Sequence, residues 1–168
     1  MKNITFKEKI NLSNYTTIKV GGFAEYFSKP NNTDEFINLI NWARLNNHKC
    51  RIIGAGSNLL INNIFLKGLT ICTKKMRSIK IESHSGIVEV EAGVMLPTMS
   101  NILAKKGLQG GEWTVGIPGT VGGSICMNAG SKQLSLANNL LSVRVIDTKT
   151  PVSYTHLLAN ETEADLVC

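Results

Sequence analysis

The spacing of apolar residues in the first third of the chain predicts a strand, a helix and a second strand. The run from residue 24 to residue 28 predicts a strand, and a helix begins after a capping Asn32 or Thr33. Apolar residues then recur every three or four positions from Phe36 to Ala43, which places them on one helix face. The apolar run 50–53 follows and predicts a buried strand, completing a strand–helix–strand unit.

Short strands and a second helix are predicted for the middle of the chain. Three β-type segments, 69–72, 78–82 and 87–92, are separated by turn or charged residues. Pro97 begins a helix that Gly107 ends, because proline suits the first helical turn and glycine the position after the last. Alternating Leu141, Val143 and Val145 predict a later strand.

Two glycine-rich segments carry the candidate chemistry. The first glycine segment, Gly54-Ala55-Gly56-Ser57-Asn58, follows the strand 50–53 directly. Glycines there let the backbone turn tightly and direct several N–H groups toward one anion, such as a diphosphate. A plain turn at the end of a strand explains the same glycines, and neither the Rossmann nor the P-loop pattern is complete.

The second glycine segment, Gly116–Gly123, lacks side-chain bulk where a flat or extended ligand can lie. Two such segments in one small domain favour a nucleotide-type cofactor over two coincidental turns. Met127–Gly130 extends this segment, and the amide of Asn128 can either bond a ring or ribose edge or simply form a turn.

Composition and charge limit the function classes. With 168 residues, 43% of them hydrophobic, the chain can bury a core as one domain, so we expect it to be ordered. Its net charge of +6 favours an anionic partner, whether phosphate, nucleic acid or anionic lipid. Basic residues between 74 and 80 lack interleaved aromatics, so a nucleic-acid-binding domain is the weakest alternative. Glycines and Pro118 interrupt the uncharged stretch 113–131, and we expect no membrane span.

The remaining candidates predict no metal site and no acid–base pair. His48 and His84 lie in polar segments without partners at metal-ligand spacing, and we expect both at the surface. Glu112 is expected to brace a loop. Four scattered cysteines predict free thiols in a reducing compartment, and the N-terminus lacks the apolar region of a signal peptide. The cysteines are Cys50, Cys72, Cys126 and Cys168.

Four motifs in order resemble the UDP-N-acetylenolpyruvoylglucosamine reductase family, also called the UDP-N-acetylmuramate dehydrogenase or MurB family. The resemblance covers roughly residues 11–146 and is far more specific than any single motif. It implies an α+β fold, the FAD-binding fold of the vanillyl-alcohol-oxidase (PCMH) type, with two α/β subdomains and the flavin between them. The elements predicted above are compatible with it. The motifs are Asn14-Tyr15-Thr16-Thr17-Ile18-Lys19-Val20-Gly21-Gly22, Gly54-Ala55-Gly56-Ser57-Asn58-Leu59-Leu60, Gly116-Ile117-Pro118-Gly119-Thr120-Val121-Gly122-Gly123 and Met127-Asn128-Ala129-Gly130.

The same resemblance implies a division of the chain. Residues 1–66 would form the first FAD-binding subdomain and residues 67–150 an incomplete second one, with the substrate-binding domain absent. Residues 151–168 do not match the family. Two interpretations of this stretch are open: a genuine C-terminal extension, or a non-native tail that resembles translated vector sequence.

Cofactor-binding residues are implied at both glycine segments and beside the second one. No catalytic residue can be assigned, because the family's arginine, serine and glutamate fall in the missing or non-matching region. The implied FAD contacts are Ile53, Gly54, Ala55, Gly56, Ser57, Asn58, Leu59, Gly116, Ile117, Pro118, Gly119, Thr120, Gly122, Gly123, Asn128, Ala129 and Gly130.

The implied reaction uses FAD to pass a hydride from NADPH to UDP-N-acetylglucosamine enolpyruvate, giving UDP-N-acetylmuramate for peptidoglycan synthesis in the cytoplasm. The cofactor supplies the hydride chemistry and the protein supplies position and electrostatics. We expect this chain by itself to bind FAD weakly and not to reduce the substrate. The alternative within the same fold is a non-catalytic flavin-binding module.

Overall fold

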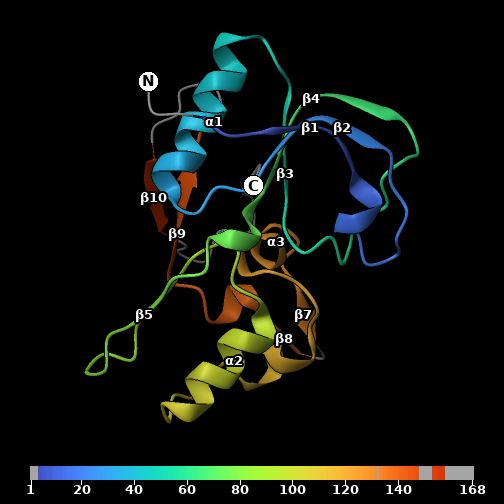
Figure 1. Ribbon diagram of the computed structural model, residues 1–168. Helices are drawn as coiled ribbons and strands as arrows, with labels where there is room; N and C mark the ends of the chain where they lie inside the picture. Colours follow the sequence, from blue (N-terminus) through green and yellow to red (C-terminus); the bar gives the residue numbers. More distant parts are fainter. Residues whose placement is uncertain (1–3, 132, 148–152, 158–168) are drawn as a thin grey trace.

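A mixed four-stranded sheet in the order β1-β2-β4-β3 forms the first part of the computed structural model, which describes residues 4–131, 133–147 and 153–157 (Figure 1). Strand β1 pairs antiparallel with β2, whereas β2, β4 and β3 run parallel to one another. The carboxyl ends of these three strands therefore share one edge of the sheet, the edge at which ligands bind in many parallel sheets. The strands are β1 (Lys7–Asn11), β2 (Phe23–Ser28), β3 (Cys50–Ile53) and β4 (Phe65–Cys72).

Helix α1 (Thr33–Leu45) covers one face of this sheet, as its apolar spacing predicts. Its N-terminus is capped by Asn32, whose side-chain oxygen accepts a hydrogen bond from the backbone N–H of Glu35 at 2.9 Å. The buried side chains on its inner face remove apolar surface from water and hold the helix to the sheet. They are Phe36, Leu39, Ile40 and Ala43, which pack in one cluster with Leu69 and Ile71 of β4.

The opposite face of the sheet is covered by the segment between β1 and β2, which begins with a short 3-10 helix, η1 (Leu12–Tyr15). Leu12 is fully buried in this second cluster. The other buried members are Ala24, Phe27, Ile53 and Cys72.

The second part of the structure lies below the sheet in Figure 1 and has its own core. An antiparallel pair, β5 (Ile79–Ile81) and β6 (Val88–Val90), leads into helix α2 (Leu96–Lys105). Pro97 lies in the first turn of α2, as predicted. The buried core joins Val94 and Leu96 to Val121 and Leu136. The remaining elements here are η2 (Thr73–Lys75), η3 (Glu112–Gly116), α3 (Val121–Cys126), β7 (Gly130–Ser131), β8 (Leu134–Ser135) and η4 (Leu136–Asn138).

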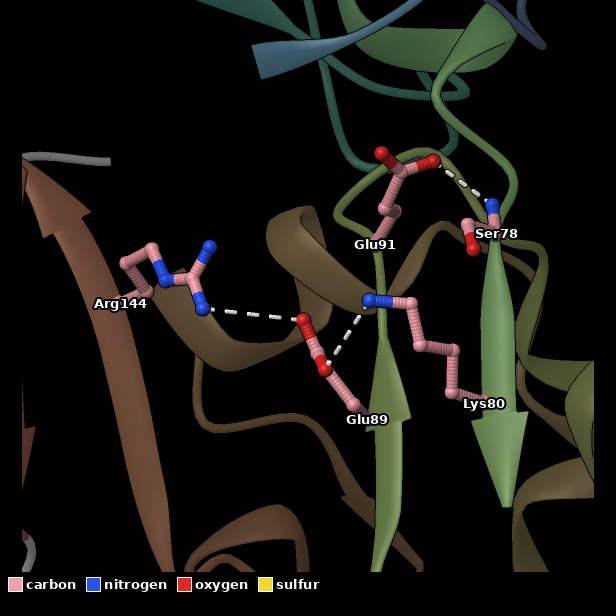
Figure 2. A network of polar contacts seen from close by, with 5 residues as sticks. All are labelled: Ser78, Lys80, Glu89, Glu91 and Arg144. Carbon is pink, nitrogen blue, oxygen red and sulfur yellow. Dashed lines mark hydrogen bonds and ion pairs between the residues drawn. The ribbon is translucent and has the colours of Figure 1, made fainter.

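Strand β9 (Ser142–Ile146) returns from the second part toward α1, where Ile146 packs against the α1 cluster. Figure 2 shows Glu89 of β6 between two cations, with Lys80 Nζ at 3.5 Å and Arg144 Nη2 at 3.7 Å. These side chains are more than half exposed, so the pairs contribute little stability. The Arg144–Glu89 pair links β9 to β6, and the Lys80–Glu89 pair links β5 to β6.

Three observations differ from the sequence-based expectations or extend them. Strand β4 belongs to the first sheet, so the boundary expected after residue 66 falls inside a strand. Gly122 and Gly123, expected in a loop, lie in the first turn of α3. Of residues 151–168, only the backbone of 153–157 is described, as β10 (Ser153–Leu157), which pairs antiparallel with β9. Among the described residues, no helix has both the length and the apolar character needed to cross a bilayer.

Candidate functional site

The two glycine segments, distant in sequence, lie in direct contact. The hydroxyl of Ser57 donates a hydrogen bond to the carbonyl oxygen of Pro118 at 2.9 Å, across 61 residues of chain. A Cβ atom added to Gly54 would overlap the hydroxyl oxygen of Thr120, and one added to Gly119 would lie 3.4 Å from the Ser57 hydroxyl. The fold therefore brings the two segments to a single place, between the first and second parts of the structure.

The first glycine segment leaves β3 at the carboxyl edge of the parallel strands and is clamped by the segment after η1. Gly56 has a φ of +72°, and a Cβ there would overlap the carbonyl oxygen of Tyr15. The backbone N–H of Thr17 donates to the carbonyl of Gly56 at 3.1 Å. Both the left-handed conformation and the close approach require glycine at this position.

The amide groups of the first glycine segment are available to a ligand. Within the part of the chain that the structure describes, the backbone N–H groups of residues 55–58 donate to no protein acceptor. Backbone amides left without partners at the end of a strand bind anions well, since each carries a partial positive charge. The segment can therefore hold an anionic group such as a diphosphate.

Buried groups at the end of β4 and just after it support the first glycine segment. The thiol of Cys72 donates to the carbonyl of Gly54 at 3.7 Å, and the hydroxyl of Thr73 donates to the carbonyl of Ile53 at 3.4 Å. Burial raises the pKa of the Cys72 thiol, so it stays protonated and acts as a donor at neutral pH. Cys50, Cys72 and Cys126 are free thiols, and Cys168 lies outside the described residues.

The second glycine segment is fixed by the start of α3 and by α2. Thr120 caps α3 by accepting a hydrogen bond from the N–H of Gly123 at 3.4 Å. The N–H of Leu96, the first residue of α2, donates to the carbonyl of Gly119 at 3.0 Å. Gly122 packs so closely that a Cβ there would lie 2.7 Å from that of Ala92. These contacts align the start of α3 with the first glycine segment.

The segment 128–130 has a structural role in the described residues. Asn128 adopts a left-handed φ of 41°, and its side-chain oxygen accepts a hydrogen bond from the N–H of Ala137 at 3.3 Å. The N–H of Ala129 donates to Ser124 at 2.8 Å. The side chain of Asn128 thus links the chain after α3 to η4.

Two of the predicted residues lie at the margins of this site. Leu59 lines a groove of about 320 Å³ beside β3, together with Ile53. At Gly116 an added Cβ would meet no atom within 4 Å, so this glycine lies in open space at the end of η3.

The remaining candidate residues are Glu112 and the two histidines His48 and His84. Glu112 accepts a hydrogen bond from the N–H of Gly110 at 2.8 Å, which confirms that it braces a loop. His84 is exposed as predicted. His48 is partly exposed, and its ring stacks on that of Trp42 with centroids 5.1 Å apart. Among the described residues, no cluster of three or more His, Cys, Asp or Glu side chains could hold a metal ion.

Tyr15, Thr17 and Ala92 contact the glycine segments without having been predicted as site residues. Tyr15 and Thr17 lie within the Asn14–Gly22 motif, so the motif itself was the available signal. Ala92 carried no such signal, because its contact with Gly122 joins two residues 30 positions apart only after folding.

Comparison with known sequences identifies related proteins. The profile of the FAD binding domain family matches residues 24–151. The UDP-N-acetylenolpyruvoylglucosamine reductase of Prochlorococcus marinus subsp. pastoris (strain CCMP1986 / NIES-2087 / MED4) is 99% identical over 150 residues, which are 89% of this chain and 51% of that protein. The same-named protein of Prochlorococcus marinus (strain NATL2A) is 44% identical over 146 residues, 87% of this chain and 50% of that protein. The chain thus spans about half the length of these curated relatives.

Comparison with solved structures finds the same family and fold. The crystal structure of UDP-N-acetylenolpyruvylglucosamine reductase from Thermus caldophilus has a TM-score of 0.71 and 28% sequence identity, covering 91% of this chain and 53% of that one. An alkyldihydroxyacetonephosphate synthase, at 18% identity and a TM-score of 0.67, covers 84% of this chain and 30% of that one and shares the fold.

Proposed function

Because the chain belongs to the FAD-binding domain family and, within it, to the UDP-N-acetylenolpyruvoylglucosamine reductases, we propose that its two glycine segments together hold FAD. The first segment would bind the diphosphate through its unpartnered amides, and the second would line the flavin. The observation that carries this proposal is the direct contact of the segments through Ser57 and Pro118.

The residues present at this site suit a dinucleotide that carries two negative charges. The amides of residues 55–58 have no protein acceptor in the described chain. Gly54, Gly56 and Gly122 keep side-chain atoms out of a crowded junction. The proposed cofactor contacts are those that the family resemblance implies, of which Asn128, Ala129 and Gly130 lie after α3 and Leu59 lies beside β3.

We further propose the role of this chain in the longer protein. It would be the cofactor-binding part of a cytoplasmic enzyme of peptidoglycan synthesis that uses NADPH to reduce UDP-N-acetylglucosamine enolpyruvate to UDP-N-acetylmuramate. Bound FAD supplies the hydride-transfer chemistry. The residues of this chain would bind the cofactor and keep it fixed relative to both parts of the structure. No substrate-protonating residue is assigned among them.

We propose that the chain divides into two FAD-binding subdomains, each built around its own hydrophobic core. The first core lies on both faces of the β1-β2-β4-β3 sheet and the second lies among α2, α3 and η4. The cofactor would lie between these parts, where the glycine segments meet. Free thiols at Cys50, Cys72 and Cys126 support a reducing compartment.

A titration of the purified chain with FAD, followed by quenching of flavin fluorescence, tests the binding proposal. We expect saturable binding of FAD, without oxidation of NADPH when the enolpyruvyl substrate is added. A chain that shows no binding would overturn the site. The longer Prochlorococcus relative, loaded with FAD, is the control for activity: reduction of the substrate supports the enzyme, whereas binding without reduction favours the non-catalytic flavin module.

A further inference from the structure

Lys29 places a positive charge at the carboxyl edge of the parallel strands. It follows β2 directly, and its side chain is partly buried. The ammonium nitrogen lies 4.6 Å from the ring centroid of Tyr15 and 5.8 Å from that of Phe27. A cation above an aromatic face is attracted by the partial negative charge of the ring's π surface. The rings of Tyr15 and Phe27 contact each other with centroids 4.4 Å apart, so packing fixes the aromatic surface on which the ammonium lies.

No carboxylate neutralises this ammonium in the part of the chain that the structure describes. Lys29 takes no part in the ion pairs of Glu89, whose partners are Lys80 and Arg144. Aromatic rings stabilise a cation but carry no net charge. Among the described residues, the charge of Lys29 is therefore available to an anionic ligand.

The ammonium and the first glycine segment have two neighbours in common. The carbonyl of Tyr15, whose ring lies under the ammonium, abuts Gly56. The thiol of Cys72 donates to the carbonyl of Gly54, and the charge of Lys29 acts on that thiol by lowering its pKa against the larger effect of burial. Lys74 also lowers the pKa of Cys72, but among the described contacts its ammonium does not lie over an aromatic ring.

From this placement we infer that Lys29 supplies a counter-charge to the diphosphate bound by the first glycine segment. This inference rests on the proposed binding of FAD there. Backbone amides carry only partial charges, whereas the diphosphate carries whole ones. A cation fixed at the same edge adds an attraction to the diphosphate. Salt should screen this attraction, because Lys29 and most of the first glycine segment are at least partly exposed.

The test compares FAD affinity among charge variants of the full 168-residue chain. Lys29→Met keeps the side-chain length over Tyr15 but removes the charge, and Lys29→Arg restores the charge. Lys49→Met is the matched control, because Lys49 lies before β3 at the opposite edge of the parallel strands. Affinities are measured by flavin fluorescence at 50 mM and at 1 M KCl, and circular dichroism checks the fold of each variant.

We expect Lys29→Met to weaken FAD binding about tenfold at low salt and no more than about twofold at high salt. Lys29→Arg and Lys49→Met should bind like the wild type. Wild-type affinity in Lys29→Met, or a loss that is equal at both salt concentrations, would overturn the role of the charge while leaving the glycine site intact. Absence of FAD binding by the wild type would instead reject the proposed function on which this inference rests.

Discussion

At the scale of single residues, the two glycine segments pack most tightly at Gly54, next to the side chain of Thr120. Replacing Gly54 with alanine would direct a methyl group into the Thr120 hydroxyl. Because overpacking forces neighbouring backbone apart, we expect Gly54→Ala to lower the free energy of unfolding by about 1–3 kcal/mol. Urea denaturation of the FAD-free chain measures this change, and the same variant should also bind FAD more weakly.

Gly116→Ala is the matched control, because an added Cβ there meets no atom within 4 Å. The double variant Gly54→Ala with Thr120→Ala removes the overlapping hydroxyl but also removes the cap of α3. Its destabilisation should therefore be smaller than the sum of the two single changes. Equal effects of alanine at positions 54 and 116 would contradict a tight junction between the segments.

At the scale of elements, local pattern was sufficient where local interactions decide the structure. The strand 50–53 and the helix after Asn32 were predicted from apolar spacing and capping residues alone. Strand β4 was predicted only from residue 69, because Gly68 interrupts the pattern; it has a φ of +92°, and its N–H donates to Glu25 at 2.6 Å. That bond joins two neighbouring strands, β4 and β2, so the residues next to Gly68 in the sequence do not predict it.

Helix α3 was missed for the same kind of reason. Glycine costs about 1 kcal/mol relative to alanine inside a helix, so Gly122 and Gly123 predicted a loop. Contacts distant in sequence override that preference: the N–H of Gly122 donates to the carbonyl of Ala92 at 2.9 Å, in a space too small for a larger residue. Likewise, each glycine segment could be found from sequence, but their contact through Ser57 and Pro118 exists only in the folded chain.

The cap of α1 provides a test at this scale. The side chain of Asn32 accepts the N–H of Glu35, and the pKa of Glu35 is lowered by hydrogen bonds from Asn31. We expect Asn32→Ala to reduce the free energy of unfolding by about 1 kcal/mol, because one amide at the helix start loses its acceptor. Asn32→Ser, which keeps a capping oxygen, should retain most of the stability in the same urea titration. If both variants behave alike, the cap does not stabilise α1.

At the scale of the whole molecule, the site joins two separately packed parts. One glycine segment extends from the first sheet and the other begins α3, and the cores behind them are distinct. The resemblance drawn from four ordered motifs, the α+β class, the flavin-binding fold and FAD as cofactor are confirmed by the matches to known sequences and structures. A ligand that contacts both segments should therefore stabilise both parts together.

Hydrogen exchange of backbone amides, with and without FAD, tests that shared site most directly. On addition of FAD, the amides of residues 55–58 and of residues 119–123 should slow together, because one ligand would contact both segments. Exchange at the exposed β5–β6 connection should stay unchanged. Slowing confined to one glycine segment, or located elsewhere while FAD is bound, would contradict the account.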